Sequence, residues 1–515
     1  MGDLIENHPL LFPFVFISNS HAMKKFFFVL IAAFACAAFA QDSADKDSAG
    51  RIISEAMKPS PLESNLEQLT DQIGGRVPGT PAMDAAVQWG VAAFKAAGAD
   101  SVKVEEFPMP HSWTEGATKM VVTISKRDPE FHVRAISIGM GPAMALHRHV
   151  RIADVGSGSA EDFSKAGDVS GAIILVHTNE MHTWDDLFDE YIRAPRIIDR
   201  AVAAHALAIA FQSTRPHDLL YRHTNSVNGE IERLPQVLVA REDAARIARL
   251  IAAGHPVFAD LEIPNKIGGP IKAANVIAEI KGGEKPYEFV ILGAHLDSWE
   301  LGTGALDNGC NAALVIDALR TIKASGLQPR RSMRFILFSG EEQGLIGSHE
   351  YVMAHRAELD KVDAMLVIDS GIGTVTGFSL GGRTDLVNSV SELIAPLKQF
   401  NATTLTTDAE WGTDHFDFML EGVPTLMANQ QEGNYLLNYH AMSDTFDKVD
   451  IPTLKRHVAE LTEAAFAIAD SPERLGPRLT HAEMEKQFEA AHFDDQLKAF
   501  GLWDDWTSGK RGRAQ

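Results

Sequence analysis

Apolar runs that predict strands alternate with longer segments that predict helices in the second half of the chain. The predicted strands are Phe289–Ala294, Met333–Phe338, Ala364–Ile368 and Pro424–Ala428, and the predicted helices are Asn308–Lys323, Gly347–His355, Arg383–Leu397 and Pro452–Ala469. Such alternation is typical of a parallel sheet with helices on both faces. From Asn275 onward we therefore expect an α/β fold with a mostly parallel mixed sheet flanked by helices.

The first half of the chain has a different pattern. Residues 41–65 are polar and expected to be loosely ordered, and between Leu66 and Gly98 two helices are expected around a Gly/Pro loop. The second of these helices covers Pro81–Ala97, and Val102–Phe107 predicts a strand. Between about Trp113 and Ile271 short strands and alanine-rich helices are mixed, as in Ala172–Val176, Gln236–Val239, Asp199–Ala206 and Arg241–Ala253. We interpret this stretch as a separate inserted α+β domain.

The N-terminus predicts a secretory signal peptide. From Met23 the chain has two lysines, then an apolar run, then Ala38-Phe39-Ala40. A positive region, a short hydrophobic region and an A-x-A cleavage site are the layout of such a leader. We expect cleavage after Ala40, a translation start at Met23, and export to the periplasm or the medium. A lipoprotein attached at Cys36 is an alternative, although Ala33-Phe34-Ala35 is a weak context for it.

Charge and cysteine content narrow the choice of function. Lys plus Arg is 47 and Asp plus Glu is 69 in 515 residues, a net charge of −22. Such an acidic chain repels nucleic acid and anionic membranes, so neither is an expected partner, and no second apolar stretch predicts a membrane span. Cys36 and Cys310 are the only cysteines. Once the leader is removed, a cysteine-based metal cage is excluded.

Acidic and imidazole side chains follow the predicted strands at the ends where sites form in open α/β sheets. The first strand ends in His295-Leu296-Asp297, the second in Ser339-Gly340-Glu341-Glu342 and the third in Asp369. Asp307 lies just before the helix after the first strand, and His440 lies in the loop after the fourth. Five potential ligands, namely His295, Asp307, Glu342 or its neighbour, Asp369 and His440, thus converge on one edge of the sheet.

Two histidines and three carboxylates are a ligand set typical of zinc in hydrolytic enzymes, with cobalt or manganese as substitutes. Five ligands fit two metal ions if one carboxylate bridges them. Asp297 is placed to accept the second N–H of the His295 imidazole. Of the pair Glu341 and Glu342, one can bind metal while the other takes a proton from the attacking water. The residues alone do not say which glutamate does which.

Three motifs carry a family resemblance: His295-Leu296-Asp297-Ser298-Trp299, Gly304-Ala305-Leu306-Asp307-Asn308 and Glu341-Glu342-Gln343-Gly344. They closely resemble the family of zinc aminopeptidases and carboxypeptidases that includes carboxypeptidase Q (plasma glutamate carboxypeptidase), from about Leu69 to Ala469. The resemblance implies two zinc ions, one held by His295 and Asp369 and one by Glu342 and His440, with Asp307 bridging and Glu341 as the base. It also implies that the inserted region is a protease-associated domain and that the chain forms a homodimer.

The resemblance and the patterns together predict five segments. They are a leader (1–40), the first part of the catalytic domain (41–112), the inserted protease-associated-like domain (113–272), the catalytic di-zinc peptidase domain (273–475) and a C-terminal tail (476–515). The tail is polar, with Trp503 and Trp506 embedded, and predicts a helix packed on the surface. Dipeptides or short peptides are the expected substrates. The resemblance places Glu410-Trp411-Gly412-Thr413-Asp414 and Tyr439 near the substrate, with Thr413, Asp414 and Tyr439 as candidate binding residues.

Parts of the sequence also match other functional classes. Gly377-Phe378-Ser379-Leu380-Gly381 matches the G-x-S-x-G motif of serine hydrolases, with Asp414 and His440 as conceivable partners, but Gly382 and Arg383 do not favour a helix directly after it. A turn between strands is the better interpretation. The thermolysin-like H-E-x-x-H is absent, because Met353 follows His349-Glu350 at the critical position. An amidohydrolase or glutaminyl cyclase on the same fold, and a non-catalytic binding module, remain alternatives.

Overall fold

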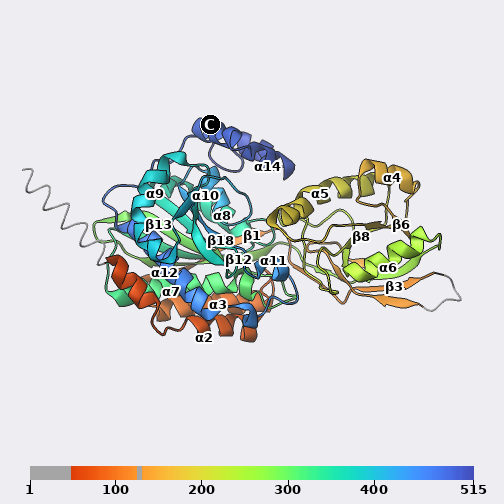
Figure 1. Ribbon diagram of the computed structural model, residues 1–515, viewed down its shortest axis with the longest axis horizontal. Helices are drawn as coiled ribbons and strands as arrows, with labels where there is room; N and C mark the ends of the chain where they lie inside the picture. Colours follow the sequence, from red (N-terminus) through yellow and green to blue (C-terminus); the bar gives the residue numbers. More distant parts are fainter. Residues whose placement is uncertain (1–47, 125–129, 515) are drawn as a thin grey trace, which may run out of the picture. The chain divides into compact units, whose positions relative to one another are not determined.

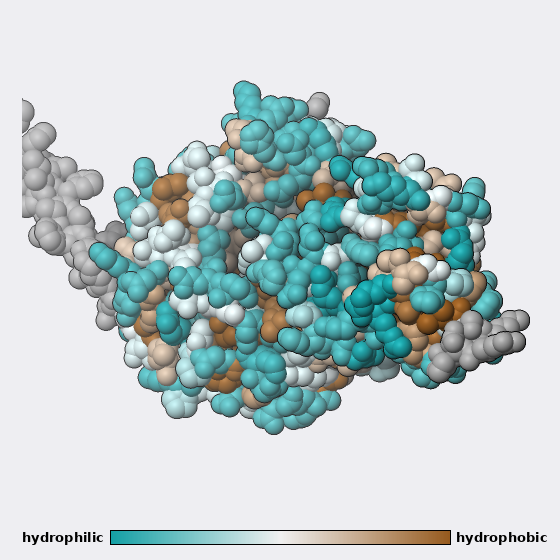
Figure 2. Space-filling model, turned by 45° about the vertical axis from the view of Figure 1, so that its right-hand side comes forward, coloured by the Kyte–Doolittle hydropathy of each residue, from teal (hydrophilic) through white to brown (hydrophobic). Residues whose placement is uncertain are grey.

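The computed structural model describes residues 48–124 and 130–514. It divides into two units, residues 1–50 and 51–515, and everything below concerns the second. The predicted signal peptide and Cys36 lie outside the described residues. Within the described part of the chain, no helix combines the length and the apolar character that crossing a bilayer requires. In Figure 2 polar residues cover most of the visible face and hydrophobic residues form small separate patches.

The first sheet has eight strands, in the order β1-β12-β14-β13-β15-β18-β16-β17. The predicted metal ligands lie at or after the ends of its central strands. Its strands are β1 (Ser101–Met109), β12 (Ile271–Ile280), β13 (Lys285–His295), β14 (Arg331–Phe338), β15 (Val362–Val367), β16 (Thr374–Ser379), β17 (Thr404–Thr406) and β18 (Thr425–Gln431). The four central strands are parallel to one another. β1 pairs antiparallel with β12, β12 with β14 and β16 with β18, whereas β16 and β17 are parallel. The sheet is therefore mixed with a parallel centre, as expected.

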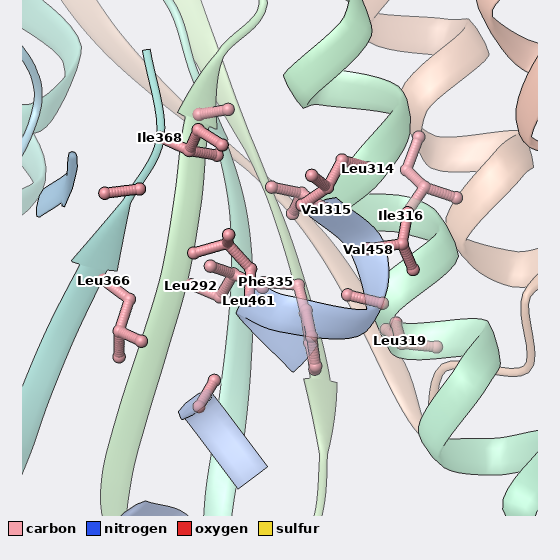
Figure 3. Packing of buried hydrophobic residues seen from close by; sticks show 14 of the residues in the cluster. Leu292, Leu314, Val315, Ile316, Leu319, Phe335, Leu366, Ile368, Val458 and Leu461 are labelled. Carbon is pink, nitrogen blue, oxygen red and sulfur yellow. The ribbon is translucent and has the colours of Figure 1, made fainter. Parts of the chain in front are cut away.

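Helices cover both faces of this sheet (Figure 1). They are α2 (Leu62–Glu67), α3 (Pro81–Ala96), α7 (Cys310–Ser325), α8 (Ile346–Ala354), α9 (Val387–Leu393), α10 (Phe416–Leu420), α11 (Tyr435–Asn438) and α12 (Ile451–Asp470), with short turns at Gln68–Ile73, Ala305–Gly309, Arg356–Lys361, Thr384–Leu386, Ala395–Phe400 and Phe446–Lys448. Successive side chains of a strand point to opposite faces. Leu292 accordingly packs with α7 and α12 (Figure 3), and Ile291 packs with Tyr351 and Phe418 from α8 and α10.

A second eight-stranded sheet is built entirely from chain between β1 and β12. Its order is β4-β3-β10-β6-β7-β8-β9-β5, and its elements are β3 (Lys119–Thr123), β4 (Phe131–Val133), β5 (Ala135–Ser137), β6 (Met144–Asp154), α4 (Ala160–Ala166), β7 (Ile173–Val176), α5 (Trp184–Ala203), β8 (Ala208–Gln212), β9 (Gln236–Val239), α6 (Arg241–Ala252) and β10 (Phe258–Ile263). A separate pair, β2 (Trp113–Thr114) and β11 (Lys266–Ile267), lies beside the entry and exit of this stretch in the sequence. Because β1 and β12 pair with each other, the chain leaves and re-enters the first sheet at one place.

Capping explains why some helices begin where they do. At the start of α3, the Thr80 side chain accepts a hydrogen bond from the Met83 amide. The helix ends at Ala96, one residue before the predicted end at Ala97. Helix α5 begins much earlier than the predicted Asp199, because Thr183 and Asp186 form a capping box. Pro195 inside α5 hides this long helix from a pattern search.

Three sequence-based expectations are wrong. Residues 51–56 and 62–67 are helical rather than loose, because Ile52 and Leu62 are buried in the main core. The predicted helix Arg383–Leu397 is broken into α9 and two short turns, with Pro396 in the second turn. The tail forms three helices, α13 (His481–Ala490), α14 (Phe493–Ala499) and α15 (Trp503–Thr507), which share a hydrophobic core around the fully buried Trp506.

Candidate metal centre

The predicted site residues lie at one edge of the first sheet, where its parallel strands end. His295 is the last residue of β13 and pairs in register with Phe338, the last residue of β14. Glu341 and Glu342 follow β14 after a short turn, and Asp369 follows β15. Neighbouring parallel strands that end together place the residues after them side by side. The structure therefore brings these side chains within a few ångströms of one another.

Three of them form a first group. The His295 Nε2 atom lies 3.2 Å from Asp307 Oδ1 and 3.2 Å from Asp369 Oδ1. One ligand atom from each residue lies within 4.8 Å of the other two, and all three side chains are buried or nearly so. This is an arrangement in which one cation could contact all three residues.

A second group shares Asp307 with the first. The His440 Nε2 atom lies 2.8 Å from Glu342 Oε2 and 3.2 Å from Asp307 Oδ2. Asp307 thus directs one carboxylate oxygen to each imidazole, and it is the one residue common to both groups. A shared carboxylate between two clusters is the arrangement that a bridging ligand requires.

Glu341 lies beside the groups but belongs to neither. Its Oε2 atom is 3.9 Å from His295 Nε2, and its side chain is 12% exposed. Together with Asp307 and Asp369 it lines a pocket over the two groups. The adjacent Glu342 side chain is almost fully buried against His440. The structure therefore gives the two glutamates different surroundings, which the residue types alone do not distinguish.

The Asp297 carboxylate does not make the contact expected from the sequence. The His295 Nδ1 atom lies 3.0 Å from the Asp297 backbone carbonyl and 3.7 Å from its carboxylate. The carboxylate instead accepts hydrogen bonds from the amides of Glu341 and Glu342, each at 3.3 Å. Asp297 therefore orients His295 through its main chain and the glutamate turn through its side chain.

His440 is oriented by a residue of the inserted region. Its Nδ1 atom lies 2.8 Å from the carbonyl oxygen of Arg222, and the Arg222 amide donates to the His440 carbonyl at 2.8 Å. Tyr221 and Ala441 form an antiparallel bridge beside this pair. The Arg222 guanidinium is fully buried and pairs with Glu115 and Glu300. The chain segments 221–222 and 440–441 thus form a short seam, named here the 222–440 seam, that fixes the imidazole.

Two buried residues, Asp444 and Arg76, shape the loop around Asp307. Neither was assigned a role from the sequence. The Asp444 carboxylate accepts hydrogen bonds from the amides of Ala305, Leu306 and Asp307 at 3.1, 2.6 and 3.1 Å. Arg76 donates to the carbonyls of Leu296, Gly74, Thr303 and Gly304 at 2.6 to 3.0 Å. Asp444 lies four residues after the predicted ligand His440 in the sequence, whereas nothing marks Arg76 except the Gly/Pro loop that contains it.

Burial and mutual charge shift the pKa values of the group strongly. Burial raises the pKa of Glu341 well above its usual range and that of Glu342 to about 7. Burial alone would lower the pKa of His440, but the charges of Glu342 and Asp307 outweigh it and raise the pKa to about 10. The pKa of His295 is likewise raised, against burial, by Asp369 and Glu341. In the metal-free protein, protons on the imidazoles therefore offset part of the buried negative charge.

The residues present fit a pair of divalent cations. Glu342 Oε1 is buried without a hydrogen-bond partner, and Asp307 Oδ2 has only its 3.2 Å contact with His440 Nε2. Such atoms are costly to bury unless another ligand binds them. Imidazole nitrogens and carboxylate oxygens are donors that zinc accepts, and bound cations would replace the imidazole protons. The donor set, the burial and the shared carboxylate are thus consistent with a two-metal centre.

A pocket of about 500 Å³ opens over this centre. Thr413 and Tyr439 line it, as do Trp184 and Tyr191 from α5 of the inserted region. The Tyr191 and Tyr439 hydroxyls lie 2.9 Å apart, and the Tyr439 ring stacks on His440 with centroids 3.7 Å apart. Asp414 is not among the lining residues; it is fully buried, and burial raises its pKa to about 8.

The G-x-S-x-G motif does not build a nucleophile elbow. Ser379 is the last residue of β16, and its hydroxyl donates to the Asp408 carbonyl at 2.7 Å. The next regular segment is the short turn Thr384–Leu386 rather than a helix starting at the serine. The motif is the end of a strand, not a turn between strands, and it lacks the geometry of a serine hydrolase.

Comparison with known proteins agrees with this fold. Residues 275–465 match the family model described as peptidase family M28. Carboxypeptidase Q of Mus musculus is 28% identical over 414 residues, which cover 80% of this chain and 86% of that protein. Carboxypeptidase Q of Homo sapiens is 25% identical over 421 residues, covering 80% and 85%.

Two solved structures show the same architecture. A peptidase M28 precursor from Shewanella amazonensis superimposes with a TM-score of 0.76 at 26% identity, covering 85% of this chain and 99% of that one. A zinc aminopeptidase from Bacillus subtilis superimposes with a TM-score of 0.62 at 20% identity, covering 81% and 97%, which supports the fold alone. The predicted α/β fold with a mixed sheet flanked by helices is confirmed.

These findings define a metallopeptidase by class. More particularly, residues 275–465 match the model of peptidase family M28, and the resemblance inferred from the sequence is confirmed.

Proposed function

We propose that this protein is a zinc-dependent exopeptidase that hydrolyses dipeptides or short peptides. The observation that carries the proposal is the pair of ligand groups that share Asp307, with Glu341 beside them and in neither. In this assignment His295 and Asp369 would hold one zinc ion, Glu342 and His440 would hold the other, and Asp307 would be shared by the two. The donor set of imidazole nitrogens and carboxylate oxygens supports the choice of metal.

When bound, the metal ions polarise the scissile carbonyl and make the attacking water more acidic. Glu341 takes a proton from that water while the water oxygen forms a bond to the carbonyl carbon. The C–N bond then breaks, and Glu341 gives the proton to the departing amine nitrogen. Asp297 holds the amides of Glu341 and Glu342 and so keeps the base turned toward the pocket. Tyr439 and Thr413 are in position to contact the substrate, and Asp414 lies behind the pocket wall.

Three wider expectations stay proposals. The inserted region 113–272 is a protease-associated domain, and its place in the pocket wall through Tyr191 supports a role in substrate binding. The mature protein is exported, to the periplasm or the medium. It forms a homodimer, and the enzyme acts without nucleic acid or membrane as a partner.

Chelation should abolish hydrolysis, and zinc should restore it. The measurement is amino-acid release from dipeptides and from peptides blocked at one end, before and after removal of metal. Loss of activity on chelation, with recovery on adding about two equivalents of zinc, supports the proposal. If a metal-loaded sample hydrolyses no member of the panel, the proposal is wrong, and cyclisation of an N-terminal glutamine peptide becomes the reaction to assay.

Removing the Asp444 carboxylate should weaken metal binding without removing a ligand. Its three backbone hydrogen bonds shape the loop that presents Asp307, so Asp444→Ala is expected to lower zinc affinity roughly 10- to 100-fold. A competing chelator measures the affinity. Asp447→Ala is the matched control, because Asp447 is exposed and pairs with Lys448. Equal affinities in the two variants would contradict a positioning role for Asp444.

A further inference from the structure

The C-terminal tail, residues 476–515, contacts the wall of the pocket over the metal centre. The ring of Phe500 in the tail stacks on the Trp411 ring, with centroids 4.3 Å apart and planes 24° apart. Trp411 lines the pocket, and Phe500 is not among the lining residues. The tail lies beyond residues 275–465, which the family model matches, so the family model does not account for this contact.

The tail also holds both ends of the short segment that carries Trp411. Ala409 and Phe416, on either side of this segment in the sequence, are buried in the hydrophobic core that the tail helices build. The Arg511 guanidinium donates to both carboxylate oxygens of Asp417 at 2.8 and 2.7 Å, and Asp417 is almost fully buried on α10. A bidentate pair of this kind fixes geometry as well as adding stability. The tail therefore supports the pocket segment before and after Trp411.

Trp411 belongs to a row of side chains in contact that runs from the tail to the metal centre. Its ring meets Tyr191 of α5 edge-on, with centroids 6.4 Å apart. The Tyr191 hydroxyl lies 2.9 Å from the Tyr439 hydroxyl, and the Tyr439 ring stacks on His440 at 3.7 Å. Trp411, Tyr191 and Tyr439 all line the pocket. The pocket wall formed by this row is therefore continuous, and Phe500 supports the end that lies farthest from the metal ligands.

A ring that neighbours hold on two sides does not turn aside for a ligand without losing those contacts. Resting on the proposed exopeptidase function, we propose that Trp411 limits the length of the peptide that the pocket accepts, and that Phe500 is a positioning residue that holds Trp411 in the wall. The pocket volume of about 500 Å³ is in the range of sites that enclose a single small ligand. The tail is then a part of the substrate pocket.

Peptide length is the variable that tests this proposal. Initial rates on dialanine and tetraalanine are compared with the metal-loaded, full-length protein. For the wild type we expect kcat/KM to be roughly tenfold higher for dialanine, a degree of discrimination that pocket shape alone can supply. Phe500→Leu keeps apolar bulk in the tail core but removes the flat ring, and it should lower this ratio roughly 2- to 10-fold, the worth of one aromatic pair. Trp411→Leu should lower it at least as far.

Two further readouts separate positioning of Trp411 from a general loss of structure. The change in Phe500→Leu should appear in KM for tetraalanine, with kcat on dialanine within about twofold of the wild type and zinc content unchanged. Phe500→Tyr keeps an aromatic ring and should restore the wild-type ratio. Lys486→Ala, an exposed change on α13 of the same tail, is the control and should also keep that ratio.

The outcomes separate this proposal from the exopeptidase function on which it rests. Equal hydrolysis of both lengths by the wild type, or a ratio in Phe500→Leu equal to that of Lys486→Ala, would overturn the length limit and leave the exopeptidase standing. Loss of zinc from Phe500→Leu would also overturn it. If no peptide is hydrolysed, calorimetric binding of the two peptides to metal-loaded wild type and Phe500→Leu decides the matter. A preference for dialanine that Phe500→Leu loses supports the length limit, and an unchanged preference or no binding overturns it.

Discussion

Glu341→Gln is expected to lower kcat by roughly 10²- to 10⁴-fold while leaving zinc content and fold unchanged. Glutamine keeps the size of the side chain but cannot accept the proton from the attacking water. Glu341 lies outside both ligand groups, so no metal contact is lost. Burial raises its pKa in the metal-free protein, as expected for a carboxylate whose side chain is only 12% exposed.

Comparing Glu341→Gln with Glu342→Gln makes this test specific to the base. Glu342→Gln should lose zinc as well as activity, because its carboxylate contacts His440 within the second ligand group. Glu350→Gln, on α8 and outside the pocket lining, is the control for charge. The measurements are kcat on a dipeptide and zinc content by elemental analysis. A near-normal kcat for Glu341→Gln, or loss of zinc equal to that of Glu342→Gln, would show that the base is assigned wrongly.

Asp307→Ala is expected to lose both metal ions and all measurable turnover. Its two oxygens face His295 and His440 separately, so removing it breaks both ligand groups at once. Asp369→Ala removes a ligand from the first group only and should retain more zinc. Because binding must displace a proton from His440, whose pKa is raised to about 10, zinc affinity should also fall as pH is lowered in every form that binds metal.

Zinc content after dialysis, measured across this series, checks the bridging role. Asp84→Ala, an exposed change on α3, should match the wild type in zinc content and activity. If Asp307→Ala kept as much zinc as Asp369→Ala, the two groups would bind metal independently and Asp307 would not bridge them.

Much of the candidate site follows from the sequence because it depends on local order along the strands. His295, the pair Glu341 and Glu342, and Asp369 each come at or just after a strand end, and parallel strands that pair in register bring their ends together. Apolar runs also located those strands to within a few residues. Short-range capping signals gave the bounds of α3 in the same way.

The residues that hold the ligands in place could not be found this way. Arg222 lies 218 residues from His440, and Asp444 is 137 residues from Asp307, so no local pattern links either pair. Asp297 shows a related difficulty. Its position two residues after His295 correctly predicted a contact with the imidazole Nδ1, but the contact is made by the Asp297 carbonyl. The carboxylate is turned to the amides after β14, which the sequence does not indicate. The tail was misjudged because its apolar residues, such as Trp506, become buried only against one another and the neighbouring elements.

The 222–440 seam also bears on how the protein is made. Arg222 leaves the ribosome long before His440, and domains generally fold as units during synthesis, N-terminal parts first. We therefore expect the carbonyl that orients the last ligand to be in place before the ligand itself is synthesised. In this respect we expect the inserted region to act as a template for the loop that carries His440, so that its excision from the gene would remove an assembly step along with the second sheet.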